Sequence, residues 1–367
     1  MSAFAPAICA RLVVKVGSAL LVGPDGKVRR AWLASLVDDI AARIAGGQQI
    51  VIVSSGAIAL GARKLGLSGG GRASLEDAQA AAATGQIALA GCWADLLGEQ
   101  GLTAAQMLLT LDDLEDRRRY LNARATIDRL LGLGAVPIVN ENDSVATEEI
   151  RFGDNDRLAA RVAQAAGAQG LVLLSDVDGL YDRNPAEPGA KLIPHVARVD
   201  AAIEAMADTR SASGMGSGGM ISKLQAAKIA CGAGVTMAIA SGRIDHPLAS
   251  LGGTVFAAAK GSGARKAWLA GRIAPRGTVH VDAGAAAALA AGRSLLAAGA
   301  MRIEGNFRRG DLVAIVGPDG APIARGLIEY DDADAARICG LRSNAIAELL
   351  GQPPRAALVH RSHMVLA

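Results

Sequence analysis

This chain has few aromatic residues, few cysteines and only a small net charge. Phe, Trp and Tyr make up 3% of its 367 residues, which leaves few rings for stacking nucleic-acid bases. The four cysteines are far apart, with no Cys-x-x-Cys pair, so we expect buried free thiols at Cys92 and Cys231. The net charge of +3 gives little support to a nucleic-acid partner.

Long apolar runs and clustered histidines are also missing. No stretch approaches the roughly 20 apolar residues of a membrane span, and the residues before the first predicted strand are too few for a signal peptide. We therefore expect a cytoplasmic protein without a membrane partner. Among the five histidines, His360 and His363 are close in sequence, and there a frayed terminus is favoured over a metal site. No Ser-His-Asp, Cys-His or metal-ligand pattern is present.

What the chain does contain predicts an α/β fold. The apolar content of 51% indicates a folded globular protein, and 367 residues exceed one ordinary core, so two domains are expected. Apolar strands alternate with helices, which predicts an αβα sandwich with a mainly parallel open sheet over residues 1–265. The predicted strands are 12–16, 50–53, 106–109, 135–139, 171–174 and 235–240, and the predicted helices are 32–44, 75–98, 118–131, 157–166 and 219–230.

The pattern changes after about residue 261. Short strands are predicted at 278–281, 312–316 and 322–328, with turns such as Gly317-Pro318-Asp319-Gly320 between them. We therefore expect a second, small and mostly β domain over residues 276–360.

A glycine-rich run, Ser213-Gly214-Met215-Gly216-Ser217-Gly218-Gly219-Met220, comes directly before the predicted helix that contains Lys223. Glycines let backbone N–H groups approach a ligand closely, and a helix N-terminus favours negative charge. Lys223 is one turn inside the helix, and its side chain leans back toward the N-terminus. This pattern predicts a phosphate site, and the alternative is a linker that precedes a helix.

Charged and hydroxyl side chains follow the first two predicted strands. Lys15 lies in an otherwise apolar strand, and because a buried lysine without a partner is costly, we expect it to reach an anion at the strand end. The alternative is an edge-strand lysine. Ser54-Ser55-Gly56-Ala57 follows the second strand and offers hydroxyl and N–H groups, although a simple helix cap has the same residues.

Three more polar segments follow buried strands or open a helix. Asn140-Glu141-Asn142-Asp143 suits a small polar ligand that carries an ammonium group, and a solvated turn is the alternative. Gly153-Asp154-Asn155-Asp156 opens a predicted helix, which either aspartate could cap. Ser175-Asp176 begins a stretch suited to nucleotide contact or to a surface turn.

One composite site accounts for these segments, because ligands of parallel sheets bind at the carboxyl ends of the strands. Two lysines, glycine-loop N–H groups and carboxylates at that edge suit phosphoryl transfer, in which positioning and charge neutralisation do most of the catalytic work.

The segments together resemble the amino acid kinase family over the whole first domain. The pair Asn140-Glu141-Asn142-Asp143 and Gly153-Asp154-Asn155-Asp156 is typical of those members that phosphorylate glutamate. The other matching segments are Val13-Val14-Lys15-Val16-Gly17, Val53-Ser54-Ser55-Gly56-Ala57, Gln106-Met107-Leu108-Leu109-Thr110, Tyr120-Leu121-Asn122-Ala123-Arg124 and Gly216-Ser217-Gly218-Gly219-Met220. The second domain resembles a PUA domain through Val281-Asp282-Ala283-Gly284-Ala285 and Gly305-Asn306-Phe307-Arg308-Arg309-Gly310-Asp311.

The resemblance implies ATP-dependent phosphorylation of the γ-carboxylate of L-glutamate to L-glutamyl 5-phosphate, the first step of proline biosynthesis. It implies that Lys15 and Lys223 neutralise the transferred phosphoryl group and that Asp156 holds both lysines. The glutamate ligands implied are Ser55, Asp143 and Asn155, with Asn140 as a weaker candidate. The ATP ligands implied are Lys15, Ser175, Asp176, Ser217, Gly218, Gly219, Met220, Ile221, Ser222 and Lys223.

The resemblance has further implications for partners. Mg²⁺ is expected to be carried by the ATP phosphates and water, without protein metal ligands. Proline is expected to inhibit at a site that overlaps the glutamate site, and a homo-oligomer is expected. PUA domains elsewhere bind RNA, but this one has no dense basic stripe or set of stacking aromatics to support RNA binding.

Two positions depart from the family pattern, and two other functions compete with this one. Ser217 and Ser54 stand where threonine is common, and each keeps a hydroxyl group. A sister kinase acting on N-acetylglutamate or carbamate is argued against by the segment from Asn140 to Asp143 and by the β-rich second domain. An RNA-directed protein would leave the two predicted site lysines unexplained.

Overall fold

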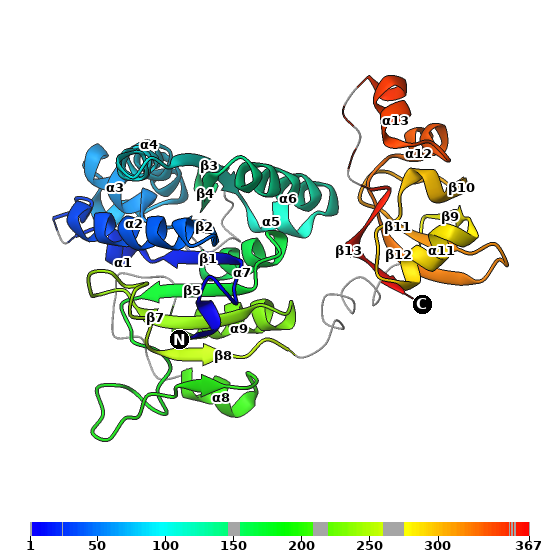
Figure 1. Cartoon of the computed structure of the whole chain (residues 1–367). Helices are drawn as coiled ribbons and strands as arrows, with labels where there is room; N and C mark the ends of the chain where they lie inside the picture. The colour runs from blue at the N-terminus through cyan, green and yellow to red at the C-terminus, as the bar shows by residue number, and fades with distance from the viewer. Residues whose placement is uncertain are drawn as a thin grey trace. The chain divides into compact units, whose positions relative to one another are not determined.

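A computed structural model of the chain describes residues 2–23, 25–145, 155–207, 219–259, 275–351, 353, 355 and 357–366. It divides into two compact units, Met1–Lys260 and Gly261–Ala367 (Figure 1). The domain limits predicted from the sequence, 1–265 and 276–360, stay a prediction, because no described residue lies between 260 and 274.

The first unit is built on an eight-stranded sheet in the order β3-β4-β2-β1-β5-β7-β8-β6. Neighbours from β3 to β7 pair in parallel, whereas β8 is antiparallel to β7. The predicted α/β fold with a mainly parallel sheet is confirmed. The strands are β1 (Arg11–Val16), β2 (Gln49–Ser54), β3 (Thr103–Leu109), β4 (Ala135–Glu141), β5 (Gly170–Ser175), β6 (His195–Val196), β7 (Thr236–Ser241) and β8 (Thr254–Phe256).

Helices cover both faces of this sheet, and the alternation of side chains along β1 shows why. Val13 packs into one core cluster with residues of α6, α7 and α9, while Leu12 and Val14 pack into another with residues of α2 and α4. Strands buried on both faces are apolar throughout. The helices are α1 (Ser18–Leu21), α2 (Arg30–Ala45), α3 (Ala57–Leu65), α4 (Leu75–Glu99), α5 (Leu111–Glu115), α6 (Arg117–Gly132), α7 (Asn155–Ala165), α8 (Ala201–Ala207) and α9 (Met220–Gly232), with 3₁₀ turns η1 (Ser2–Phe4), η2 (Ser68–Gly71) and η3 (Asp143–Val145).

The second unit has a five-stranded sheet in the order β10-β9-β11-β12-β13, in which β9 and β11 are parallel and the other pairs antiparallel. The strands are β9 (Gly277–Val281), β10 (Ala300–Gly305), β11 (Leu312–Val316), β12 (Pro322–Ile328) and β13 (Val359–Leu366). The unit also contains α11 (Ala283–Ala290), η4 (Ala297–Gly299), α12 (Asp332–Ile338) and α13 (Ser343–Leu350). The three strands predicted here are present, whereas β10, β13 and the helices were not predicted.

Helix α4 is long and apolar enough to cross a membrane, judged by length and composition alone. The sequence analysis expected no such segment. Its Leu89, Trp93 and Leu97 side chains are fully buried in the core cluster against the sheet. That burial is typical of the core helix of a globular domain.

Helices α3 and α4 touch through their backbones. A Cβ atom on Gly85 of α4 would overlap the carbonyl group of Ala57, and one on Gly61 of α3 would overlap the carbonyl group of Ala81. The two glycines therefore allow a separation between the helices that no larger residue permits at these positions.

We predict that Gly85→Ala lowers the free energy of unfolding by about 2 kcal/mol or more, because the added methyl group forces the helices apart. Gly91→Ala on the same helix is the matched control, since a Cβ there meets nothing within 4 Å. It should leave stability unchanged or raise it by up to about 1 kcal/mol through helix propensity. Urea unfolding of both variants checks this, and equal effects would contradict the close contact.

Candidate active site

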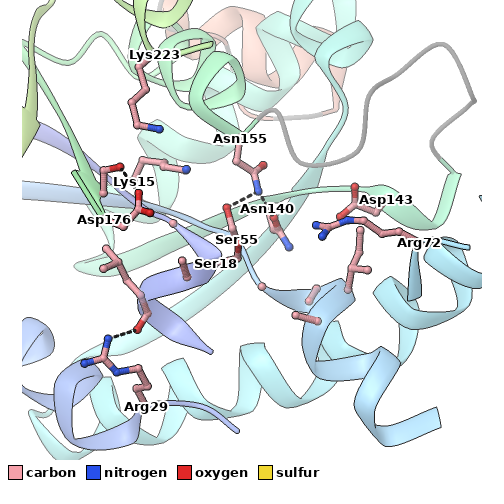
Figure 2. A pocket seen from close by; sticks show the side chains of 18 of the residues that line it. Lys15, Ser18, Arg29, Ser55, Arg72, Asn140, Asp143, Asn155, Asp176 and Lys223 are labelled. Atoms are coloured by element: carbon pink, nitrogen blue, oxygen red, sulfur yellow. Dashed lines mark hydrogen bonds between the residues drawn. The ribbon is translucent and has the colours of Figure 1, made fainter. Parts of the chain in front are cut away.

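The carboxyl ends of β1, β2, β4 and β5 open on one cavity of about 540 Å³ (Figure 2). This is the edge at which parallel α/β sheets bind their ligands. The lining residues are Lys15, Gly17, Ser18, Ala19, Leu20, Arg29, Ser55, Gly56, Ala57, Ile58, Ala59, Arg72, Asn140, Asp143, Asn155, Ser175, Asp176, Lys223 and Arg243.

Asp156 holds two lysines from distant parts of the chain. Its Oδ1 lies 2.7 Å from Lys15 Nζ and its Oδ2 lies 3.0 Å from Lys223 Nζ. The carboxylate is 2% exposed, so three elements, β1, α7 and α9, meet at this point. Burial opposes ionisation, but the two ammonium groups outweigh it and lower the pKa of Asp156 to about 2.

The three buried groups together carry a net positive charge, because two ammonium groups face one carboxylate. Lys15 is 8% and Lys223 6% exposed, and both side chains line the cavity. Helix α9 adds to the positive potential at its N-terminus. It begins at Met220, and its N-cap residue Gly219 has no side chain that could accept hydrogen bonds from the first turn. A buried cation pair at a helix N-terminus is suited to an anion such as a phosphoryl group.

A chain of hydrogen bonds orients the amide groups at the ends of β2 and β4. Asn155 Nδ2 donates to Ser55 Oγ at 2.8 Å and to Asn140 Oδ1 at 3.1 Å. Asn140 Nδ2 in turn donates to Gln86 Oε1 of α4 at 2.7 Å. Figure 2 shows Asn155 reaching toward Ser55 and Asn140 across this part of the cavity.

Two buried acceptors in the same region have no hydrogen-bond partner among the described residues. They are Asn155 Oδ1 and Asp143 Oδ1. Asp143 is 6% exposed; burial raises the pKa of its carboxyl to about 6, although the positive charge of Arg72 acts to lower it. Buried polar groups are nearly always paired, so these two acceptors are suited to a ligand that donates hydrogen bonds, as an ammonium group does.

Short loops bring the remaining predicted residues to the cavity. Gly56 adopts a φ of 111°, a left-handed conformation that favours glycine, and so turns the chain from Ser55 into α3. Ser175 Oγ at the end of β5 donates to Asp176 Oδ1 at 3.2 Å, and both residues line the cavity.

The predicted glycine loop is described only from Gly219 onward. Met220, Ile221 and Ser222 form the first turn of α9 before Lys223, and Ile221 is 53% exposed. Ser217 and Gly218 lie outside the described residues, as does the Gly153-Asp154 part of the other predicted segment.

The sequence analysis missed several residues of the cavity. Gln86 lies in an alanine-rich helix pattern and contacts the site only because α4 is pressed against α3. Arg72 follows a run of three glycines, which was a usable turn signal. Arg29 and Arg243 are exposed arginines in loops, and no local pattern distinguishes them from other surface arginines.

Comparisons with known proteins show which families and proteins the chain resembles. The model of the amino acid kinase family matches residues 10–241, and the model of the PUA domain matches residues 277–350. A glutamate 5-kinase from Sphingopyxis alaskensis is 67% identical over 100% of both chains. One from Novosphingobium aromaticivorans is 64% identical over 98% of this chain and 96% of its own, and one from Zymomonas mobilis is 58% identical over 99% and 93%.

Because the pKa of Asp156 is lowered, we predict that the free energy of unfolding depends on pH through this carboxyl. A carboxyl whose pKa is about 2 when folded stabilises the fold above its unfolded pKa of about 4, and loses that contribution as the pH falls toward 2. Asp156→Asn removes it at every pH and leaves two buried lysines without their anion. The stability difference between wild type and this variant should therefore be largest above pH 5 and shrink by about 2 kcal/mol toward pH 2. Thermal unfolding over this range tests it; a constant difference would contradict the assignment.

Proposed function

The chain belongs to the amino acid kinase family, and on that premise we propose that it transfers the terminal phosphoryl group of ATP to the side-chain carboxylate of L-glutamate. The product is L-glutamyl 5-phosphate, which enters proline biosynthesis. The observation that carries this proposal is the buried carboxylate of Asp156 between the ammonium groups of Lys15 and Lys223, at one end of a cavity whose other end has unpaired acceptors.

In the proposed reaction, an oxygen of the glutamate γ-carboxylate attacks the γ-phosphorus of ATP. The new P–O bond forms as the bond to the β-phosphate oxygen breaks, and ADP leaves with that electron pair. No proton has to move, because the attacking carboxylate is already ionised. Lys15, Lys223 and the N–H groups at the start of α9 stabilise the negative charge on the transferred group.

Asp156 acts on the reaction through the lysines. Its two oxygens fix both ammonium groups on the cavity side of the sheet. A lysine side chain has four rotatable bonds and loses much freedom when it is held. Because Asp156 holds both lysines before the substrates arrive, that ordering is already complete in the free enzyme.

Glutamate is proposed to lie with its ammonium group at the other end of the cavity. Asp143 Oδ1 and Asn155 Oδ1 are buried acceptors without described partners, and the ammonium group would supply the missing donors. Ser55 and Asn140, which hold the Asn155 amide, complete this part of the site.

ATP is proposed to bind along Ser175, Asp176 and the segment from Ser217 to Lys223. Ser175 and Asp176 line the cavity, and Figure 2 shows Asp176 near Lys15. Within the described ranges, no three His, Cys, Asp or Glu side chains converge as metal ligands. Mg²⁺ is proposed to arrive on the ATP phosphates and to keep mainly waters as its other ligands.

The family resemblance supports three further parts of the proposal: a homo-oligomeric enzyme, a cytoplasmic location and inhibition by proline. Proline carries a cationic amine next to a carboxylate, as the α-carbon of glutamate does. It would therefore compete for the acceptors Asp143 and Asn155 without presenting a carboxylate to the lysines.

Purified protein with ATP, Mg²⁺ and L-glutamate should release ADP, and hydroxylamine should trap the acyl phosphate as a hydroxamate. Matched reactions with N-acetylglutamate and with carbamate are the controls. N-acetylation removes the ammonium group that the buried acceptors would bind, so its turnover should be far lower. ADP release with either control substrate but not with glutamate would assign the chain to a sister activity.

Lys15→Ala and Lys223→Ala should each lower kcat by about 10²-fold or more, as loss of a donor to the transition state does. Lys228→Ala is the matched control, because Lys228 lies on the same helix α9 but forms an exposed ion pair with Glu204. It should keep wild-type kcat. Steady-state kinetics at saturating ATP and glutamate measure all three variants. Near-normal turnover in either site variant contradicts the role given to that lysine.

A further inference from the structure

Arg72 enters the cavity from a turn whose position is fixed on both sides. Gly69, Gly70 and Gly71 have φ values of 59°, 65° and 73°, so three consecutive residues take the left-handed conformation that favours glycine. Gly71 is buried, and a Cβ on it would lie 2.7 Å from the Cβ of Ala62 in α3 and 3.1 Å from the Cβ of Ala81 in α4. The Arg72 side chain therefore starts from a point held between two packed helices.

The Arg72 side chain extends toward Asp143 at the wall of the cavity (Figure 2). Burial raises the pKa of the Asp143 carboxyl, and the positive charge of Arg72 acts to lower it. The structure shows no ion pair between Arg72 and any described carboxylate, and Asp143 Oδ1 has no described hydrogen-bond partner. A cation and a buried anion thus face the same part of the cavity, without neutralising each other by direct contact.

A free amino acid carries the complementary pair of charges on one carbon atom. Its ammonium group matches Asp143, and its α-carboxylate matches a guanidinium, which binds carboxylates with two parallel N–H donors. Figure 2 shows Arg72 and Asp143 together on one side of the cavity and Lys15, Lys223 and Asp176 on the other. A glutamate molecule that spans the cavity would place its side-chain carboxylate at the lysines.

We propose that Arg72 binds the α-carboxylate of the amino-acid substrate and, together with Asp143, makes the site specific for a free α-amino acid. This inference rests on the proposed function, because it takes glutamate as the substrate. It adds a specificity-determining residue that the sequence motifs did not include.

Two analogues of glutamate separate the two charges. Glutarate keeps both carboxylates and lacks the ammonium group, whereas 4-aminobutyrate keeps the ammonium group and lacks the α-carboxylate. We would measure KM for glutamate and the competitive inhibition constants of both analogues for wild type, Arg72→Ala and Asp143→Asn. Inhibition constants are used because they do not require the analogues to be phosphorylated.

Arg72→Ala should raise KM for glutamate and the inhibition constant of glutarate by about 10- to 100-fold, the value of a charge-assisted hydrogen bond. The constant for 4-aminobutyrate should change less than about twofold. Asp143→Asn should show the opposite pattern, weakening glutamate and 4-aminobutyrate and sparing glutarate. Arg72→Lys should recover part of the affinity for glutamate, since the charge is kept without the bidentate geometry.

Arg63→Ala is the matched control, because Arg63 is an exposed arginine in the last turn of α3 and does not line the cavity. It should leave all three constants unchanged. The inference is overturned if Arg72→Ala weakens the three ligands equally or weakens none of them. Failure of the proposed function has a different signature, because wild type itself would then release no ADP with glutamate.

Discussion

The contact between one buried carboxylate and two lysines is the interaction on which the rest of this molecule depends. Either lysine alone at this depth would be costly without an anion. Asp156 supplies one anion for two cations, so the fold retains both charges and leaves an excess positive charge at the cavity. That excess is what a phosphoryl group in transit requires. The same contact joins β1, α7 and α9. One cluster therefore both holds these three elements together and provides the positive charge proposed for catalysis.

The opposite end of the cavity combines both signs of charge, because the Arg72 guanidinium faces it together with the buried Asp143 carboxylate. There the buried groups are acceptors, and Asp143 and Asn155 each keep an oxygen without a described partner. A ligand with a carboxylate at one end and an ammonium group at the other fits the cavity in one direction. The ammonium group and the α-carboxylate of the proposed substrate would both bind at this end, and its side-chain carboxylate would then face the lysines.

The sequence predicted the central sheet well because the physics of a parallel sheet is local. Strands buried on both faces are continuous apolar runs, and the runs at 12–16 and 171–174 correspond to β1 and β5. The short strands β6 and β8 have two and three residues, too few to show a pattern in the sequence. In the second unit, β10 has mostly exposed side chains and so shows no apolar run.

Site residues could be predicted where polar side chains lie in or directly after an apolar strand. They could not be predicted where their position depends on how helices pack. Lys15 was predictable because a charge inside an apolar strand must be compensated. Arg72, which lines the cavity, and Gln86, which accepts a hydrogen bond from Asn140 behind it, were missed, because both positions depend on how α3 and α4 pack. That packing depends on the close approach of backbone atoms at Gly61 and Gly85. A glycine within a helical pattern does not reveal which other segment packs against it.

The close contact between α3 and α4 bears both on the stability of the fold and on the proposed specificity of the cavity. Helix α3 begins beside Ser55, α4 carries Gln86, and the turn between the two helices carries Arg72. Because the helices touch through their backbones, these three side chains belong to one rigid body. The lysines belong to another, assembled around Asp156 from β1, α7 and α9. Asn155 lies next to Asp156 in α7 and donates to Ser55 and Asn140, which adds a side-chain link to the strand pairing that already joins β1 to β2. Preorganised sites need supporting contacts of this kind, because misplacement by an ångström is enough to lose most of the rate. The Asn155 hydrogen bonds in the first turn of α7 therefore help to fix the proposed ammonium site relative to the two lysines.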